Sequence, residues 1–118
     1  MKLTNAEVFL SREPLRKLMD EKLPVKVAYG LAKAAHKLNE QLQVLEEVRN
    51  GLIRKYGVEN KEGKISVEQG NPNWDAFVTD FDELLSQETE LVIERVKLPE
   101  TLMIETNVLA PLEKIVYV

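Results

Sequence analysis

Apolar residues recur at alternating spacings of three and four through the middle of the chain. The stripe consists of Ala28, Leu31, Ala35, Leu38, Leu42, Leu45, Leu52 and Tyr56. Only Arg49 interrupts it, next to Val48. Such a heptad pattern between Pro24 and Gly57 predicts one helix of about 30 residues, roughly 45 Å long at 1.5 Å per residue. The apolar seam of this helix is narrow and needs a partner.

A shorter amphipathic helix is predicted from residue 74 to about residue 88. Its apolar residues follow the i, i+3, i+4, i+7 spacing of one helix face: Trp74, Phe77, Val78, Phe81, Leu84 and Leu85. We expect this helix to pack antiparallel on the long one and to cover part of the seam. About 15 residues cannot cover about 30, so the rest of the seam must meet the N-terminal helices, a small sheet or another subunit.

The N-terminal segment contains two helix-start signals. Thr4-Asn5-Ala6-Glu7 has the form of a capping box, which predicts a short helix beginning there. Ser11-Arg12-Glu13-Pro14 predicts a second start, because Ser caps helices and Pro is tolerated in a first turn.

The remaining segments favour short strands and one more helix. Residues 64–67 and 90–98 are rich in β-branched residues and are predicted strands, the second ended by Pro99 and paired with residues 102–104. A last short helix is predicted to begin near Thr106, and the apolar segment 115–118 is expected to pack on the core or on a neighbour.

These elements predict a single domain spanning residues 1–118, of the α+β class and mostly α. A long helix packs antiparallel on a shorter amphipathic helix, with short N-terminal helices and a small β-sheet. A hydrophobic fraction of 44% and a charged fraction of 31% are ordinary for a folded chain of 118 residues.

Composition removes several classes of chemistry. The absence of cysteine excludes disulfides and thiolate catalysis, and a single histidine leaves no zinc site of the usual kinds. Residues 1–37 carry eight Lys/Arg and four Asp/Glu, and residues 38–118 carry eight and sixteen, so the two parts have charges of +4 and −8. This asymmetry argues mildly against nucleic acid as the main partner.

No segment is long and apolar enough to span a bilayer, and the N-terminus lacks a signal peptide, so we expect an intracellular protein.

Candidate chemistry is sparse. His36 lies one step off the seam without an acid–base partner in sequence, and no Ser or Thr stands in a nucleophile elbow. Asp80 and Glu83 form one acidic pair of the spacing found in all-α nucleotide pyrophosphatases that bind Mg²⁺. The long helix offers no clean companion pair, because Arg49 follows Glu46 by one turn and would repel a cation. We therefore assign no catalytic, cofactor or metal residue.

Three positions on the long helix leave alternatives open. Gly30 and Gly51 lie near the seam, where each is either a tolerated glycine or a site of close backbone approach. Arg49 either marks the end of the buried stretch or pairs with Asp82 or Glu83 across an interface.

Several segments together resemble a set of short uncharacterised proteins encoded by tailed bacteriophages and prophages. The matching residues are Lys2-Leu3-Thr4-Asn5, Leu23-Pro24-Val25, Leu38-Asn39-Glu40, Arg49, Lys55-Tyr56-Gly57, Asn73-Trp74, Phe77, Phe81, Glu83-Leu84 and Leu112-Glu113. The resemblance implies a phage context, in the cytoplasm of a bacterial host or associated with the virion, where small proteins assemble particles or modify host machinery. It transfers no functional residue, because these are packing and capping patterns.

The sequence therefore predicts a non-enzymatic protein that acts by self-association or by docking on another phage or host protein. The interface candidates are the seam positions Leu38, Leu42, Leu45 and Leu52, with Arg49 and Tyr56 at the edge. One alternative is a modifier that binds a host protein or nucleic acid through the basic N-terminal third, which includes Arg12, Arg16, Lys17, Lys22 and Lys26. The other alternative is the Mg²⁺-dependent nucleotide pyrophosphohydrolase.

Overall fold

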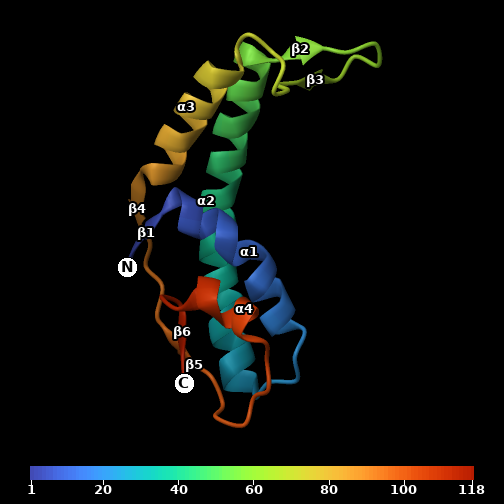
Figure 1. Ribbon diagram of the computed structural model, residues 1–118. Helices are drawn as coiled ribbons and strands as arrows, with labels where there is room; N and C mark the ends of the chain where they lie inside the picture. Colours follow the sequence, from blue (N-terminus) through green and yellow to red (C-terminus); the bar gives the residue numbers. More distant parts are fainter.

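A single long helix sets the shape of the molecule. The computed structural model describes residues 1–118, with α2 running from Val25 to Tyr56 as one helix of 32 residues. The molecule is elongated along this helix, with principal extents of 51 × 29 × 22 Å (Figure 1). The long helix predicted between Pro24 and Gly57 is thus confirmed.

Helix α1, Asn5–Met19, packs on α2 and begins with the predicted capping box. The Thr4 hydroxyl accepts from the Glu7 N–H at 3.1 Å, and the Glu7 carboxylate accepts from the Thr4 N–H at 2.9 Å. The predicted second start at Ser11–Pro14 is wrong, because Pro14 lies inside one continuous helix. Proline removes a donor to the carbonyl of Leu10, and that residue is 66% exposed, so water can satisfy the carbonyl.

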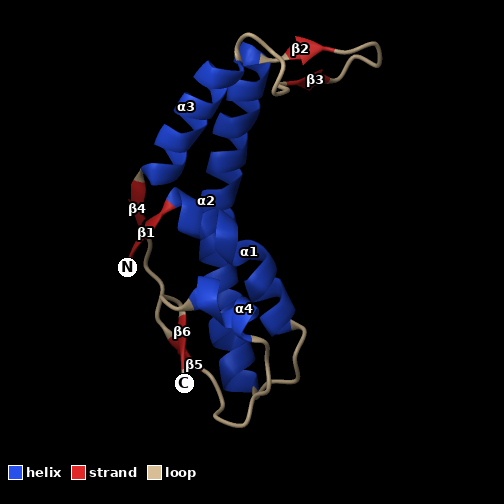
Figure 2. Ribbon diagram, viewed as in Figure 1, coloured by secondary structure: helices blue, strands red, loops and turns tan.

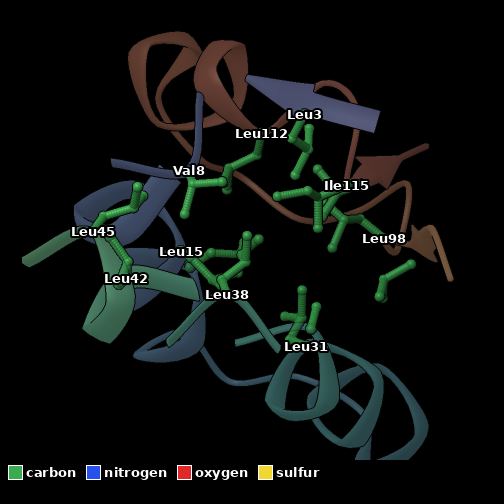
Figure 3. Close-up of a cluster of buried hydrophobic side chains, with 14 residues drawn as sticks. Leu3, Val8, Leu15, Leu31, Leu38, Leu42, Leu45, Leu98, Leu112 and Ile115 are labelled. Carbon is green, nitrogen blue, oxygen red and sulfur yellow. The ribbon is translucent and has the colours of Figure 1, made fainter. Parts of the chain in front are cut away.

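The core forms where both ends of the chain meet the first two-thirds of α2. All seventeen buried residues belong to residues 1–45 or 96–118, and none lies between residues 46 and 95. Leu15 of α1, Leu38 of α2, and Leu98, Leu112 and Ile115 near the C-terminus point toward one another (Figure 3). We call this part, residues 1–45 and 96–118, the body.

The remaining part of α2 projects from the body together with α3, Trp74–Ser86. The two helices run antiparallel, as predicted, and the loop between them carries a small hairpin of β2, Val58–Glu59, and β3, Ile65–Ser66 (Figure 1). We call residues 46–86 the arm. The arm is one helix pair thick along most of its length, because α1 reaches only the base of α3 (Figure 2).

Three separate two-stranded ladders take the place of one small sheet. Strand β1, Lys2–Thr4, pairs antiparallel with β4, Glu88–Glu90, and the hairpin β2–β3 is the second ladder. Strand β5, Val96–Lys97, pairs in parallel with β6, Val116–Tyr117.

The strand predicted over residues 90–98 is interrupted, because residues 91–95 join no ladder. The prediction that residues 102–104 form its partner is wrong, since β6 takes that place.

The last helical turns match the prediction. Helix α4, Thr106–Leu109, continues into a 3-10 turn η1, Ala110–Leu112. Ile115 and Val116 are 2% and 5% exposed, so the apolar C-terminal segment packs on the body. The chain is therefore α+β and mostly α. None of its helices combines the length and the apolar character that crossing a bilayer requires.

Candidate functional site

The six seam residues predicted as interface candidates divide into two groups. Leu38, Leu42 and Leu45 are 2%, 4% and 1% exposed and belong to the intramolecular core (Figure 3). Helix α1 and the C-terminal segments cover them, so they are not accessible to a partner in this structure. Arg49, Leu52 and Tyr56 lie on the arm and are partly exposed. Only this second group remains available for an interface.

Tyr56 has a side-chain hydrogen-bond partner on the arm, whereas the Nε of Arg49 has none. The Tyr56 hydroxyl donates to the Asp80 carboxylate at 2.6 Å and ties the end of α2 to the middle of α3. Arg49 forms no ion pair with Asp82 or Glu83, and its buried Nε has no hydrogen-bond partner. The seam of the arm therefore contains a buried polar atom, the Nε of Arg49, that lacks a hydrogen-bond partner.

The residues considered for catalysis do not converge. The His36 side chain is 77% exposed, and it lies 3.2 Å from Glu40, one helical turn away. No group of three or more His, Asp or Glu side chains lies close enough to hold a metal ion. Asp80, the first residue of the acidic pair, already accepts the hydrogen bond from Tyr56.

The two helical glycines have different surroundings. A Cβ on Gly30 would lie 3.2 Å from Cγ2 of Val96, so this glycine permits β5 to pack closely on α2. A Cβ on Gly51 would meet nothing within 4 Å. The packing role is thus established for Gly30, whereas nothing in the chain itself requires a glycine at position 51.

The arm leaves apolar surface uncovered. None of the residues of α3 is buried, although the helix carries a row of aromatic rings. Phe77 stacks on Phe81 at 5.8 Å between ring centroids, and Trp74 and Phe9 continue the row at 6.1 and 6.3 Å.

A second uncovered surface lies on the α2 helix itself. Val44 and Val48 are 52% and 42% exposed and lie four residues apart, followed by Gly51 after three more. Residues with this spacing share one helix face. We call Val44, Val48 and Gly51 the outer stripe.

An open groove of about 1200 Å³ lies between the N-terminal half of α2 and residues 92–100. Five cationic side chains line it: Lys26, Lys33, Lys37, Arg95 and Lys97. Two carboxylates, Glu94 and Glu100, oppose them, so the lining has a net charge of +3 with a neutral histidine. This positive charge stands out in a chain whose net charge is −4.

The groove also has apolar and aromatic walls. Tyr29 and Val92 are 64% and 84% exposed. The Lys33 ammonium lies 4.9 Å from the centre of the Tyr29 ring, and the Arg95 guanidinium lies 5.0 Å from that of Tyr117. Arg95 also donates to the backbone carbonyls of Glu113 and Val116 and is therefore held in place.

Sequence reasoning missed this groove because its two walls are about sixty residues apart in the chain. One signal was present: Lys26, Gly30, Lys33 and Lys37 are separated by four, three and four residues and share a helix face. The fold then brings Arg95 and Lys97 to the same place.

The rest of the basic N-terminal third is partly neutralised. Arg12 pairs with Glu46 at 3.0 Å, and Arg16 lies 3.7 Å from Glu13 on the same helix. Lys26 belongs to the groove. Lys17 and Lys22 are exposed and belong to neither an ion pair nor the groove, so the cations predicted as one binding surface are divided among three settings.

Lys114 bonds to the start of α1. Its ammonium donates to Glu7, and this hydrogen bond, followed by the one from the Thr4 N–H, holds the pKa of the Glu7 carboxyl below its ordinary value of 4.5. The pair joins the C-terminal segment to the first helix of the body.

Neither a protein family, nor a curated protein, nor a solved structure matches this chain.

Proposed function

We propose that this protein is non-enzymatic and acts by self-association through the arm and the outer stripe, which begins at Val44 in the body, in a phage or prophage context where particle assembly is the first role to test. One observation carries the proposal: the arm has apolar residues along both helices, and none of residues 46–86 is buried. A helix pair that leaves this much apolar surface open is typical of a protein that packs against another helix.

The outer stripe favours a second copy of the chain as the partner. Gly51 costs about 1 kcal/mol of helix propensity relative to alanine, and no contact within the chain offsets this cost. Two copies placed antiparallel about the middle of the stripe bring Val44 of each opposite Gly51 of the other. The same register places Glu40 opposite Lys55, which gives charge complementarity at both ends.

Light scattering of the purified chain tests this proposal. We expect a dimer at micromolar concentration for the wild type and a monomer for the double variant Val44→Glu with Val48→Glu. Both valines are about half exposed, so the circular dichroism of the variant should match that of the wild type, and the unfolding midpoints should stay close at a concentration where neither chain associates. Val25→Glu is the matched control, because Val25 is 85% exposed on the same helix but lies at its other end.

A wild-type chain that remains monomeric at high micromolar concentration would overturn self-association. Copurification from cells in which the parent phage or prophage is active then decides what the arm binds. Capsid or tail proteins in stoichiometric yield, lost in the double variant, would indicate docking in particle assembly. A single host protein would indicate a modifier.

A further inference from the structure

We propose that the groove between α2 and residues 92–100 binds single-stranded nucleic acid. It shares no residue with the outer stripe, so the inference goes beyond the proposed self-association. Three features carry it: cations without an ionic partner, aromatic rings beside those cations, and a charge distribution that keeps the acidic part of the chain away from the groove.

The five cations of the groove are not neutralised within the chain. The ion pairs of the molecule use other cations: the amino terminus, Arg12, Arg16, His36 and Lys114. Glu94 and Glu100 line the same groove but pair with none of its cations. Positive charge that is left unpaired in a groove attracts an anionic ligand.

The cations on α2 form one line. Lys26, Lys33 and Lys37 are exposed, lie seven and four residues apart, and share a helix face. The line covers a helix length of about 17 Å at 1.5 Å per residue. Cations along this length can follow the backbone of about four nucleotides, which is the short end of the range for single-strand binding folds.

The other wall contributes a cation that is fixed in position. Nη2 of Arg95 donates to the backbone carbonyls of Glu113 and Val116 at 2.9 and 3.1 Å. The other N–H groups of this guanidinium donate to no acceptor within the chain, so they are available to a phosphate. Because the side chain is already held, binding a phosphate costs it little conformational entropy.

Each exposed tyrosine of the groove lies next to one of these cations. Tyr29 is 64% exposed with Lys33 beside its ring, and Tyr117 is 42% exposed with Arg95 beside its ring. A base can stack on such a ring while its phosphate meets the adjacent cation. An acidic peptide has carboxylates but no base to stack, and a duplex keeps its base faces inside its own stack. The pairing of rings with cations therefore favours a single strand.

The acidic residues that make the chain negative lie mainly on the arm. Residues 46–86 carry five Lys/Arg and nine Asp/Glu, so the arm has a charge of −4 and accounts for the whole net charge of the chain. The groove lies beside the opposite end of α2 (Figure 1). Lys37 precedes the arm by nine residues of helix, about 14 Å, which exceeds the Debye length of about 10 Å at 0.1 M salt. The net charge of the chain therefore does not prevent a nucleic acid from binding here.

The test measures the fluorescence anisotropy of a labelled thymidine octamer with the full chain at several salt concentrations. We expect saturable binding, with a slope of log K against log salt of about −2, because the net charge of the lining is +3 and each phosphate contact on a single strand contributes about −0.7. A uridine octamer is measured in parallel, and the tighter of the two identifies the preferred sugar.

A pair of lysine variants tests the location of the site. Lys33→Gln combined with Lys37→Gln should lower the affinity about tenfold and reduce the slope by about 1.4, because two phosphate contacts are lost. Lys61→Gln combined with Lys64→Gln is the matched control. These two lysines are exposed and unpaired in the loop of the β2–β3 hairpin, so the control removes the same charge and should leave both values unchanged.

A tyrosine variant tests base stacking. Tyr29→Leu should lower the affinity about fivefold without changing the salt slope, since stacking involves no counterion release. The variant should fold as the wild type does, because Tyr29 is largely exposed. Inorganic polyphosphate of eight units provides the contrast: its binding should weaken in the lysine variant but not in the tyrosine variant. Gly51→Ala lies outside the groove and should bind normally, so this result does not depend on self-association.

Four outcomes would overturn the proposal. The first is no saturable binding of either octamer at low salt and millimolar protein. The second is an octaglutamate peptide that displaces the octamer with equal affinity, which would assign the cations to acidic peptides. The third is a duplex of the same length that binds as tightly as the single strand, or a normal affinity of Tyr29→Leu. The fourth is an equal loss of affinity in the hairpin control.

Discussion

The body and the arm share one helix but stabilise it differently. Along α2, Leu31, Leu38 and Leu45 are almost completely buried by α1 and the C-terminal segments, whereas Leu52 and Tyr56 are only partly covered by α3. The same heptad pattern thus serves as core in one half and as surface in the other. The comparison teaches that periodicity identifies an apolar stripe but not which chain covers it.

The largest expected difference in stability is between the truncation of a leucine in the body and that of a leucine in the arm. Leu38→Ala should lower the free energy of unfolding by about 2–5 kcal/mol, because the leucine is 2% exposed and truncation leaves a cavity. Leu52→Ala should cost about 1–2 kcal/mol, because water already reaches that side chain. Urea unfolding of the two variants at low protein concentration measures the difference. Equal losses would show that the arm is covered as fully as the body.

The next effect compares the two helical glycines. Gly51→Ala should raise the free energy of unfolding of the monomer by about 1 kcal/mol, because alanine favours the helix and its Cβ enters open space. Gly30→Ala should raise the free energy of unfolding by less than this, or lower it, because Val96 must move to accept the new methyl group. Thermal unfolding of both variants below the concentration at which the chain associates provides the measurement.

The same glycine variant sharpens the self-association proposal. Gly51→Ala should weaken the dimer while it stabilises the monomer, since the added methyl group occupies the space expected for Val44 of the second copy. An unchanged or stronger dimer would place the contact elsewhere on the arm.

The smallest effect is confined to the body and depends on pH. The folded-state pKa of Glu7 is lowered, chiefly by Lys114, so its contribution to stability is present above pH 4.5 and is lost as pH falls through the lower folded-state pKa. Glu7→Gln should remove less than about 1 kcal/mol at pH 7, because the ion pair is partly exposed. Urea unfolding from pH 3 to pH 7 should show a flatter profile for the variant below pH 4.5. Lys114→Met is the control, and it should remove most of the same pH dependence.

The local signals in the sequence were sufficient for α2, α3, the start of α1 and the fold class. The heptad stripe predicted α2, and the capping box predicted the start of α1. The aromatic spacing predicted α3 as the antiparallel neighbour of α2. Pro14 misled the prediction of two N-terminal helices, because the burial of Ser11 and Leu15 outweighs the lost hydrogen bond.

Strand pairing and the groove depend on contacts between distant segments, which periodicity does not encode. Residues 90–98 have the propensity of one strand, but their partners lie at opposite ends of the chain, β1 for β4 and β6 for β5. The interface candidates Leu38, Leu42 and Leu45 were correctly identified as seam residues, but only the fold shows that the chain itself covers them.

The pairing of β1 with β4 has a consequence for the order of folding. Asn5 donates to carbonyls of Leu84 and Gln87, and the adjacent strands join residues 2–4 to residues 88–90. During synthesis, the beginning of α1 therefore emerges long before the segment that completes it. The long helix and α1 can form early, but the body reaches its final packing only after the C-terminal third has left the ribosome.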